Sequence, residues 1–160
     1  MGSEQNEGRL VVLCGLPGSG KSTVAGSLAR ELGAVRLSSD EWLDALGFDL
    51  YDEEARARVD GLQQRLALEL VTLGNTVIYE SGGWTRAERD ALREAARAVG
   101  AAVELRYLDV PVETLWQRLE ARNAALPPAS VVIERDDLLL WAAGIEPPDA
   151  GEQQRYDEPR

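Results

Sequence analysis

The feature that most constrains this chain is a glycine-rich turn between an apolar run and a helical pattern. Residues 15–22 read Gly-Leu-Pro-Gly-Ser-Gly-Lys-Ser, which fits the spacing glycine, four residues, glycine, lysine, serine or threonine. Residues 10–14 are all apolar, as in a strand buried on both faces. Residues 21–32 repeat apolar side chains at helical spacing and stop at Gly33. This order predicts the first crossover of a parallel α/β sheet, where open sheets bind ligands.

The rest of the chain continues to alternate between strand and helix patterns. Strands are expected at 34–37, 76–79 and 103–108, the last near a sheet edge. A short helix capped by Ser39 or Asp40 is expected after the first of these. Longer helices are expected after Asp52, after a capping box of Thr85 and Glu88, near Pro111, and at 134–143. The length of 160 residues favours one domain at 9–145, between a disordered leader at 1–8 and a loose polar tail at 146–160.

The composition excludes several kinds of chemistry. The chain has no histidine and one cysteine, Cys14, so a Ser-His-Asp triad and a metal site of histidines or thiolates are excluded. The groups that remain available for chemistry are carboxylates, hydroxyls, lysine, arginine and a bound hard cation. The formal charge of −11 repels a long nucleic acid, which we therefore do not expect as a partner.

The chain also lacks any apolar run of the roughly 18 residues that a membrane span needs. Its first residues have no secretory core, and a lone cysteine fits a reducing compartment. We expect a cytoplasmic protein without a membrane partner. Its expected ligands are a nucleotide and a small-molecule substrate, and its expected state is a monomer or a homodimer.

The glycine turn has the chemistry of a phosphate-binding loop. Glycines allow backbone N–H groups to converge on an anion, and the following helix adds its positive end. We expect the Lys21 ammonium to reach the β- and γ-phosphates of ATP or a related nucleotide, Ser22 to bind Mg²⁺, and Thr23 to contact the α-phosphate. The alternative is a glycine-rich helix start with a solvated lysine. The predicted nucleotide-binding residues are Gly15, Pro17, Gly18, Ser19, Gly20, Lys21, Ser22 and Thr23.

Together with later segments, this loop resembles small P-loop kinases, a group that includes polynucleotide 5′-hydroxyl kinases, zeta-toxin-like kinases and chloramphenicol kinases. The resemblance spans about residues 9–145 and is carried by Gly-Leu-Pro-Gly-Ser-Gly-Lys-Ser-Thr at 15–23, Leu-Ser-Ser-Asp-Glu-Trp at 37–42, Val-Ile-Tyr-Glu at 77–80, Thr-Arg-Ala-Glu-Arg at 85–89 and Leu-Trp-Gln-Arg-Leu-Glu-Ala-Arg-Asn at 115–123. It implies a three-layer P-loop NTPase fold with a small, mostly parallel sheet in the order 2-3-1-4. A short helical lid is also implied.

Two carboxylates are candidates for chemistry. The resemblance implies that Asp40 accepts the proton of the hydroxyl being phosphorylated, and a carboxylate at the end of a neighbouring strand is able to orient a hydroxyl. Asp40 has the alternative role of a helix cap. Glu80 ends the third strand and is a candidate to hold a Mg²⁺-bound water or to contact the acceptor. The resembling polynucleotide kinases carry an arginine three residues after the aspartate, where this chain has Leu43.

Several further side chains are candidates to contact the substrates. Arg118 and Arg122 lie four residues apart on one helix face, and the resemblance places such a pair in a lid over the phosphates. Glu113 and Glu134 are candidate ion-pair partners for them, and a solvated surface pair is the alternative. Trp84 and Arg86 follow the third strand, so we expect them near the acceptor. Core packing of the tryptophan and solvent exposure of the arginine are the alternatives.

We therefore expect an ATP- and Mg²⁺-dependent kinase that transfers the γ-phosphoryl group to a hydroxyl of a small molecule such as a sugar, nucleoside, antibiotic or other metabolite. Lys21, Asp40, Arg118 and Arg122 are its predicted catalytic residues. Two alternatives remain. One is a polynucleotide 5′-hydroxyl kinase, against which the charge and Leu43 both argue. The other is a nucleotide-dependent ATPase or switch module.

Overall fold

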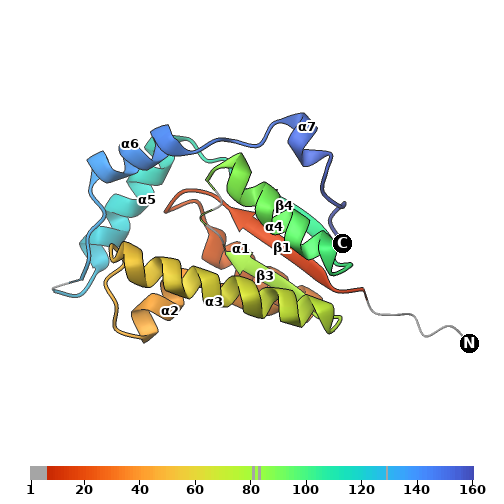
Figure 1. Cartoon of the computed structure of the whole chain (residues 1–160). Helices are drawn as coiled ribbons and strands as arrows, with labels where there is room; N and C mark the ends of the chain where they lie inside the picture. The colour runs from red at the N-terminus through yellow and green to blue at the C-terminus, as the bar shows by residue number, and fades with distance from the viewer. Residues whose placement is uncertain (1–6, 81, 83, 129) are drawn as a thin grey trace, which may run out of the picture.

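The protein folds around a small parallel sheet. The computed structural model describes residues 7–80, 82, 84–128 and 130–160, so most of the expected leader at 1–8 lies outside the described residues. The strands hydrogen-bond in the order β2-β3-β1-β4, and every pair is parallel (Figure 1). The predicted α/β class and strand order are confirmed. The strands are β1 (Arg9–Cys14), β2 (Val35–Ser38), β3 (Thr76–Glu80) and β4 (Ala102–Tyr107).

Helices fill the connections between the strands and extend beyond the last one. The Thr85–Glu88 capping box and the Asp52 cap form as predicted. The predicted cap of the short second helix was wrong: Ser38, not Ser39 or Asp40, accepts the hydrogen bond from Glu41 N. Strand β2 ends at Ser38, one residue later than expected, and α2 follows it directly, so Ser38 both ends the strand and caps the helix. The helices are α1 (Lys21–Leu32), α2 (Ser39–Ala45), α3 (Glu53–Thr72), α4 (Arg86–Ala98), α5 (Val112–Ala125), α6 (Arg135–Gly144) and α7 (Ala150–Gln153).

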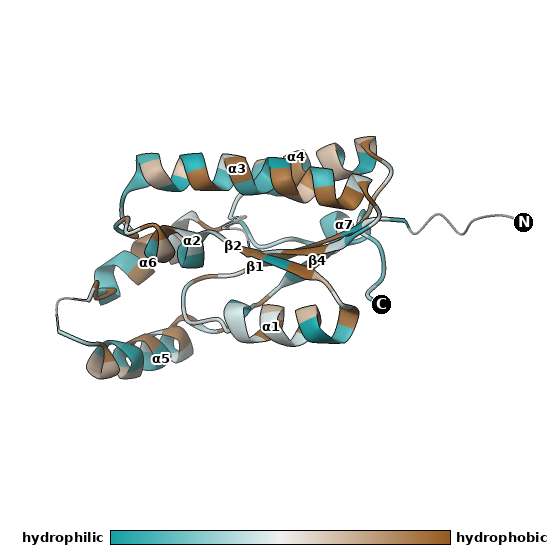
Figure 2. Ribbon diagram, turned by 90° about the horizontal axis from the view of Figure 1, so that it is seen from below, coloured by the Kyte–Doolittle hydropathy of each residue, from teal (hydrophilic) through white to brown (hydrophobic). Residues whose placement is uncertain are grey.

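The sheet is covered on both faces, which explains the apolar run at its centre. Figure 2 shows α3 and α4 on one face and α1 on the other. Side chains alternate along β1, so Leu10 and Val12 pack toward α3 and α4, while Val11 and Leu13 pack against α1. A strand with both faces buried is a nearly continuous apolar run, and the one charged residue of β1, Arg9, pairs with Glu104 of β4. All six residues of β1 are buried.

The C-terminal segment packs on the body of the protein instead of forming the expected loose tail. Its residues pair with the open edge of β4, where Val103 N donates to Asp157 Oδ2 at 2.6 Å and Asp157 N donates to Val103 O at 2.8 Å. Glu152 of α7 forms a fully buried ion pair with Arg89 of α4. The C-terminal segment is polar but ordered, because its carboxylates bind groups that are distant in the sequence.

Helices α5 and α6 lie beyond the carboxyl ends of the strands, on the side where α1 begins (Figure 1). They form their own apolar cluster, in which Leu115, Leu119 and Leu138 are buried together with Leu16 of the glycine loop. The loop therefore lies between the sheet and this helical pair. Across the part of the chain that the structure describes, no helix has the length and apolarity needed to cross a bilayer.

Candidate active site

The glycine loop connects β1 to α1 at the carboxyl edge of the sheet. Gly18 has a φ of 82°, and a β-carbon there would lie 3.2 Å from both Leu115 O and Leu119 Cγ of α5. Only glycine combines this left-handed backbone with so close an approach. Within the described residues, the buried Ser19 hydroxyl has no hydrogen-bond partner in the protein. An unpaired buried hydroxyl in a loop at a helix N-terminus is suited to an anionic oxygen.

Lys21 begins α1, and its ammonium points back into the loop. Its Nζ donates to Gly15 O at 2.7 Å. Burial lowers the pKa of Lys21 from its ordinary value, while the nearby negative charges of Asp40 and Glu80 act to raise it. A desolvated ammonium at the start of a helix is suited to a polyphosphate, whose negative charge would stabilise the charged form of the lysine.

The side chains of Ser22 and Glu80 bring two oxygen atoms together at the start of α1. Ser22 Oγ donates to Glu80 Oε1 at 3.1 Å, and the other carboxylate oxygen accepts from Arg36 Nε at 2.6 Å. Mg²⁺ prefers hard oxygen ligands and is commonly held by one or two protein groups together with substrate phosphates. The hydroxyl and the carboxylate therefore fit this ion. Arg36 also pairs with Glu41 at 2.9 Å, so it fixes Glu80 from the side of β2.

Asp40 lies in the first turn of α2, next to the strand end that carries Ser38. Its carboxylate is exposed and accepts from Arg56 Nη2 at 2.8 Å. Ser38 and Glu80 are register partners on neighbouring strands, so Asp40 and Glu80 follow adjacent strand ends. Because Ser38 caps the helix, the Asp40 side chain remains available for another partner. Both carboxylates therefore lie on the edge of the sheet that carries Lys21.

A buried polar network lies directly behind Asp40. The Ser39 hydroxyl contacts the carboxylate of Asp60 and lies 3.0 Å from Gln63 Oε1. Ser39 and Gln63 are both buried. The network joins the start of α2 to the middle of α3, and it fixes the position of the residue that precedes Asp40. Leu43, where the resembling polynucleotide kinases have arginine, is fully buried in the apolar cluster between these helices.

The two predicted lid arginines are placed differently by the structure. Arg118 Nη1 donates to Gly18 O at 3.1 Å, so this side chain contacts the glycine loop. Arg122 lies one turn further along α5 and is exposed. The predicted pairing of Glu113 with these arginines was wrong, because Glu113 pairs with Arg135 of α6 at 2.8 Å. This ion pair links α5 to α6 instead.

Trp84 and Arg86 are placed beside the C-terminal segment. Trp84 packs in the apolar cluster of α5 and α6, with its ring centroid 6.1 Å from that of Trp141. Arg86 N donates to Glu146 Oε2 at 3.0 Å, and the Arg86 guanidinium is 3.8 Å from Asp149. The described contacts of both residues are thus structural. Residues 81 and 83, just before them in the chain, lie outside the described residues.

The structure therefore brings together most of the predicted site. Lys21, Ser22, Glu80 and Arg118 have contacts in the loop or at the start of its helix, and the charge of Asp40 acts on Lys21. Trp84 reaches the loop only through the apolar cluster that includes Leu16, and Arg86 and Arg122 have no described contact with the loop. Sequence reasoning missed the contact of Arg56 with Asp40 and that of Arg36 with Glu80. Their signal is weak, because a single arginine on a helix or strand has no distinctive spacing and its partner is distant in the chain.

Comparisons with known proteins agree with this geometry. A family model described as an AAA domain matches residues 10–148. Shikimate kinase 2 of Escherichia fergusonii is 37% identical over 112 residues, covering 68% of this chain and 59% of the relative. The chain thus spans less than two thirds of that relative's length. The resemblance to P-loop kinases is confirmed.

Two solved structures share the fold. A gluconokinase from Sinorhizobium meliloti 1021 superposes with a TM-score of 0.60 at 22% identity, over 90% of this chain and 78% of that chain. A chain of the Pnkp1/Rnl/Hen1 RNA repair complex superposes with a TM-score of 0.73 at 22% identity, over 94% of this chain and 46% of that chain. At this level of identity the two structures establish the fold alone.

Proposed function

Because the chain belongs to the AAA-domain family whose model matches residues 10–148, we propose that it is a kinase that transfers the γ-phosphoryl group of ATP to a hydroxyl of a small molecule. The single observation that carries the proposal is the meeting of Lys21, Asp40 and the Ser22–Glu80 pair at one edge of the sheet. The relatedness to a shikimate kinase supports the reaction class. The relatedness does not identify the acceptor.

The proposed reaction is a direct in-line transfer. The acceptor oxygen forms a bond to the γ-phosphorus, the bond from that phosphorus to the bridging oxygen breaks, and ADP leaves. The hydroxyl proton passes to Asp40, which is positioned beside Lys21. Ser22 and Glu80, whose side chains are hydrogen-bonded to each other, would hold magnesium, and the ion would supply positive charge to the phosphates. Lys21, which donates to Gly15 O, and Arg118, which donates to Gly18 O, contribute positive charge at the loop.

The test is transfer of label from γ-labelled ATP to a panel of hydroxyl compounds and to a 5′-hydroxyl oligonucleotide. Three enzymes are compared: the wild type, Asp40→Asn, and the matched control Asp44→Asn, whose carboxylate is exposed one turn further along α2. We expect label on a small compound, a loss of about 10²-fold or more in Asp40→Asn, and no change in the control.

Three outcomes would refute this assignment in different ways. Label on the oligonucleotide alone would establish the polynucleotide alternative. Hydrolysis of ATP without any labelled acceptor would favour an ATPase or switch module. Full transfer by Asp40→Asn would show that this carboxylate is not the base, and Glu80 would then be the remaining carboxylate at this edge with a described contact to the loop helix.

A further inference from the structure

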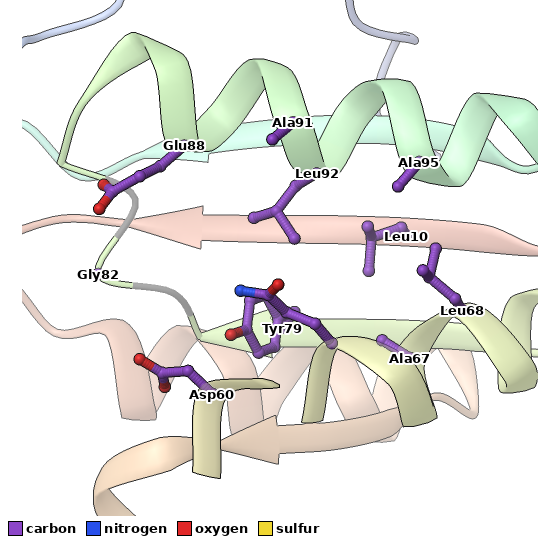
Figure 3. Close-up of a pocket in the computed structure, with 11 residues that line it drawn as sticks. Leu10, Asp60, Ala67, Leu68, Tyr79, Gly82, Glu88, Ala91, Leu92 and Ala95 are labelled. Carbon is purple, nitrogen blue, oxygen red and sulfur yellow. The ribbon is translucent and has the colours of Figure 1, made fainter. Parts of the chain in front are cut away.

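A cavity of about 320 Å³ lies between α3 and α4 over the surface of β1 and β3. This volume is at the lower end of the range of pockets that bind small molecules. Figure 3 shows the cavity running along the strands, with Gly82, Asp60 and Glu88 toward their carboxyl ends and Leu10, Leu68 and Ala95 at the other end. The polar end therefore lies toward the edge of the sheet where the phosphate-binding loop lies.

The lining of the cavity is divided by chemistry. Its far end is apolar, with Leu10, Leu68 and Ala95 on three different elements. Its polar end carries two carboxylates, Asp60 from α3 and Glu88 from α4, on opposite sides. Among the described residues that line the cavity, none is basic. The lining therefore favours a positively charged or neutral ligand with an apolar body and disfavours an anion.

Both carboxylates keep acceptor capacity toward the cavity. Asp60 accepts from the Ser39 hydroxyl, and Glu88 accepts from Thr85 N through Oε2 at 3.1 Å. A carboxylate offers about four acceptor positions, so one bond leaves others for a ligand. The phenol of Tyr79 lies between them, and burial together with the Asp60 charge raises its pKa to about 12. Tyr79 therefore stays neutral, and the carboxylates are the charged groups of this lining.

The polar end lies next to the residues that precede the two candidate carboxylates of the proposed reaction centre. Asp60 contacts Ser39, which directly precedes Asp40. Tyr79 directly precedes Glu80 on β3, and its register partner on β2 is Leu37. A ligand whose apolar body fills the cavity would thus place its polar end beside the residues that precede the two candidate carboxylates.

From this placement, and resting on the kinase function proposed above, we infer that the cavity binds the acceptor and that the acceptor is a small amino alcohol with an apolar substituent. Its ammonium group faces Asp60 and Glu88, its apolar part lies against Leu10, Leu68 and Ala95, and its hydroxyl points out of the cavity toward the loop. This charge preference is opposite to that of an enzyme whose acceptor carries a carboxylate.

Three matched compounds test the charge preference. The first is phenylalaninol. In the second a hydroxyl replaces the amine, and in the third a carboxylate replaces it, so that the benzyl group and the primary hydroxyl stay the same. Binding is measured by titration calorimetry in the presence of magnesium and a non-hydrolysable ATP analogue, and transfer is measured with labelled ATP. We expect the amine to bind roughly tenfold more tightly than the diol, the lower end for a charge-assisted hydrogen bond, and the carboxylate to bind most weakly.

Two variants test separately how the Asp60 carboxylate and the apolar end of the cavity contribute to binding. Asp60→Asn should remove the advantage of the amine and keep the binding of the diol, which also shows that the variant is folded. Ala95→Leu should weaken all three compounds by filling the apolar end. The matched control is Ala98→Leu, the same substitution at an exposed position of the same helix outside the cavity. It should leave binding unchanged.

A preference for the carboxylate compound, an amine advantage that survives in Asp60→Asn, or the absence of binding by all three compounds would each overturn the inference. Failure of the acceptor inference can be distinguished from failure of the proposed kinase function. If another hydroxyl compound accepts label without this charge pattern, only the acceptor inference fails. If ATP and magnesium bind but no hydroxyl compound accepts label, the kinase proposal fails and takes the acceptor inference with it.

Discussion

The buried pair of Arg89 and Glu152 provides a sharp test of how the C-terminal segment is held. The two side chains are 0% and 1% exposed, and the carboxylate accepts from Arg89 Nε at 2.6 Å and from Nη2 at 2.9 Å. Replacing Glu152 by alanine leaves the guanidinium buried without this carboxylate. Loss of one partner of a buried ion pair costs about 3–5 kcal/mol of unfolding free energy. For a chain of this length that corresponds to a fall in Tm of about 6–20 °C.

Thermal and urea unfolding, followed by circular dichroism, measure this cost. The matched control is Glu54→Ala, which removes a carboxylate from the Arg58 pair whose side chains are 76% and 77% exposed. We expect the control to change the unfolding free energy by less than about 0.5 kcal/mol. The double variant Arg89→Leu with Glu152→Leu should recover most of the loss, because neither charge of this pair is left buried without the other.

Equal effects of Glu152→Ala and Glu54→Ala would refute the reasoning, since they would mean that the C-terminal segment is not packed in solution. A double variant as unstable as Glu152→Ala would show that the cost comes from lost packing of α7 and not from the buried charge.

Three further predictions concern the loop and its surroundings. Burial raises the pKa of the Cys14 thiol to about 12, so a thiol reagent at neutral pH should label it only on unfolding, and rapid labelling of the native protein would contradict its position. Nucleotide binding should raise the lowered pKa of Lys21, because the phosphates bring negative charge to its ammonium group. At alkaline pH the protein should therefore take up protons when it binds the nucleotide, which is measured as a binding heat that varies with the ionisation heat of the buffer. Release of protons would contradict this. Gly18→Ala should lower the unfolding free energy by about 1–2 kcal/mol because of backbone strain, and by a further amount because the new β-carbon meets α5. At Gly20 the φ is 94° and a β-carbon would have no neighbour within 4 Å, so Gly20→Ala should lose stability through backbone strain alone. Equal losses in the urea midpoints of the two variants would refute the contact.

The parts of the fold that could be predicted from the sequence depend on local signals. The glycine loop, the apolar run of β1 and the Thr85–Glu88 capping box each need only a few neighbouring residues. The strand order follows from a resemblance that spans most of the chain. The predicted cap of α2 was at least one residue too late, because β2 extends to Ser38 through its pairing with β3 and the local sequence does not show where that pairing ends.

The remaining contacts depend on residues that are distant in the sequence. Arg89 and Glu152 are 63 residues apart, and Arg36 and Glu80 are 44 apart. A polar C-terminal segment gives no sign that one of its carboxylates is buried. Likewise, the pairing of Glu113 with Arg135 depends on how α6 folds back on α5. The periodicity of apolar residues shows which face of a helix or strand is buried. It does not show which other element packs against that face.

The central claim is that the loop from Gly15 to Ser22 binds a nucleoside triphosphate, and its most direct test is calorimetric titration of the protein with ATP and magnesium. The variants are Lys21→Ala and the matched control Arg30→Ala, which removes an exposed cation in the last turn of the same helix. We predict binding at one site in the wild type, a loss of about tenfold or more in Lys21→Ala, and no change in Arg30→Ala. Absence of binding by the folded wild type, or equal affinity in Lys21→Ala, would contradict the claim.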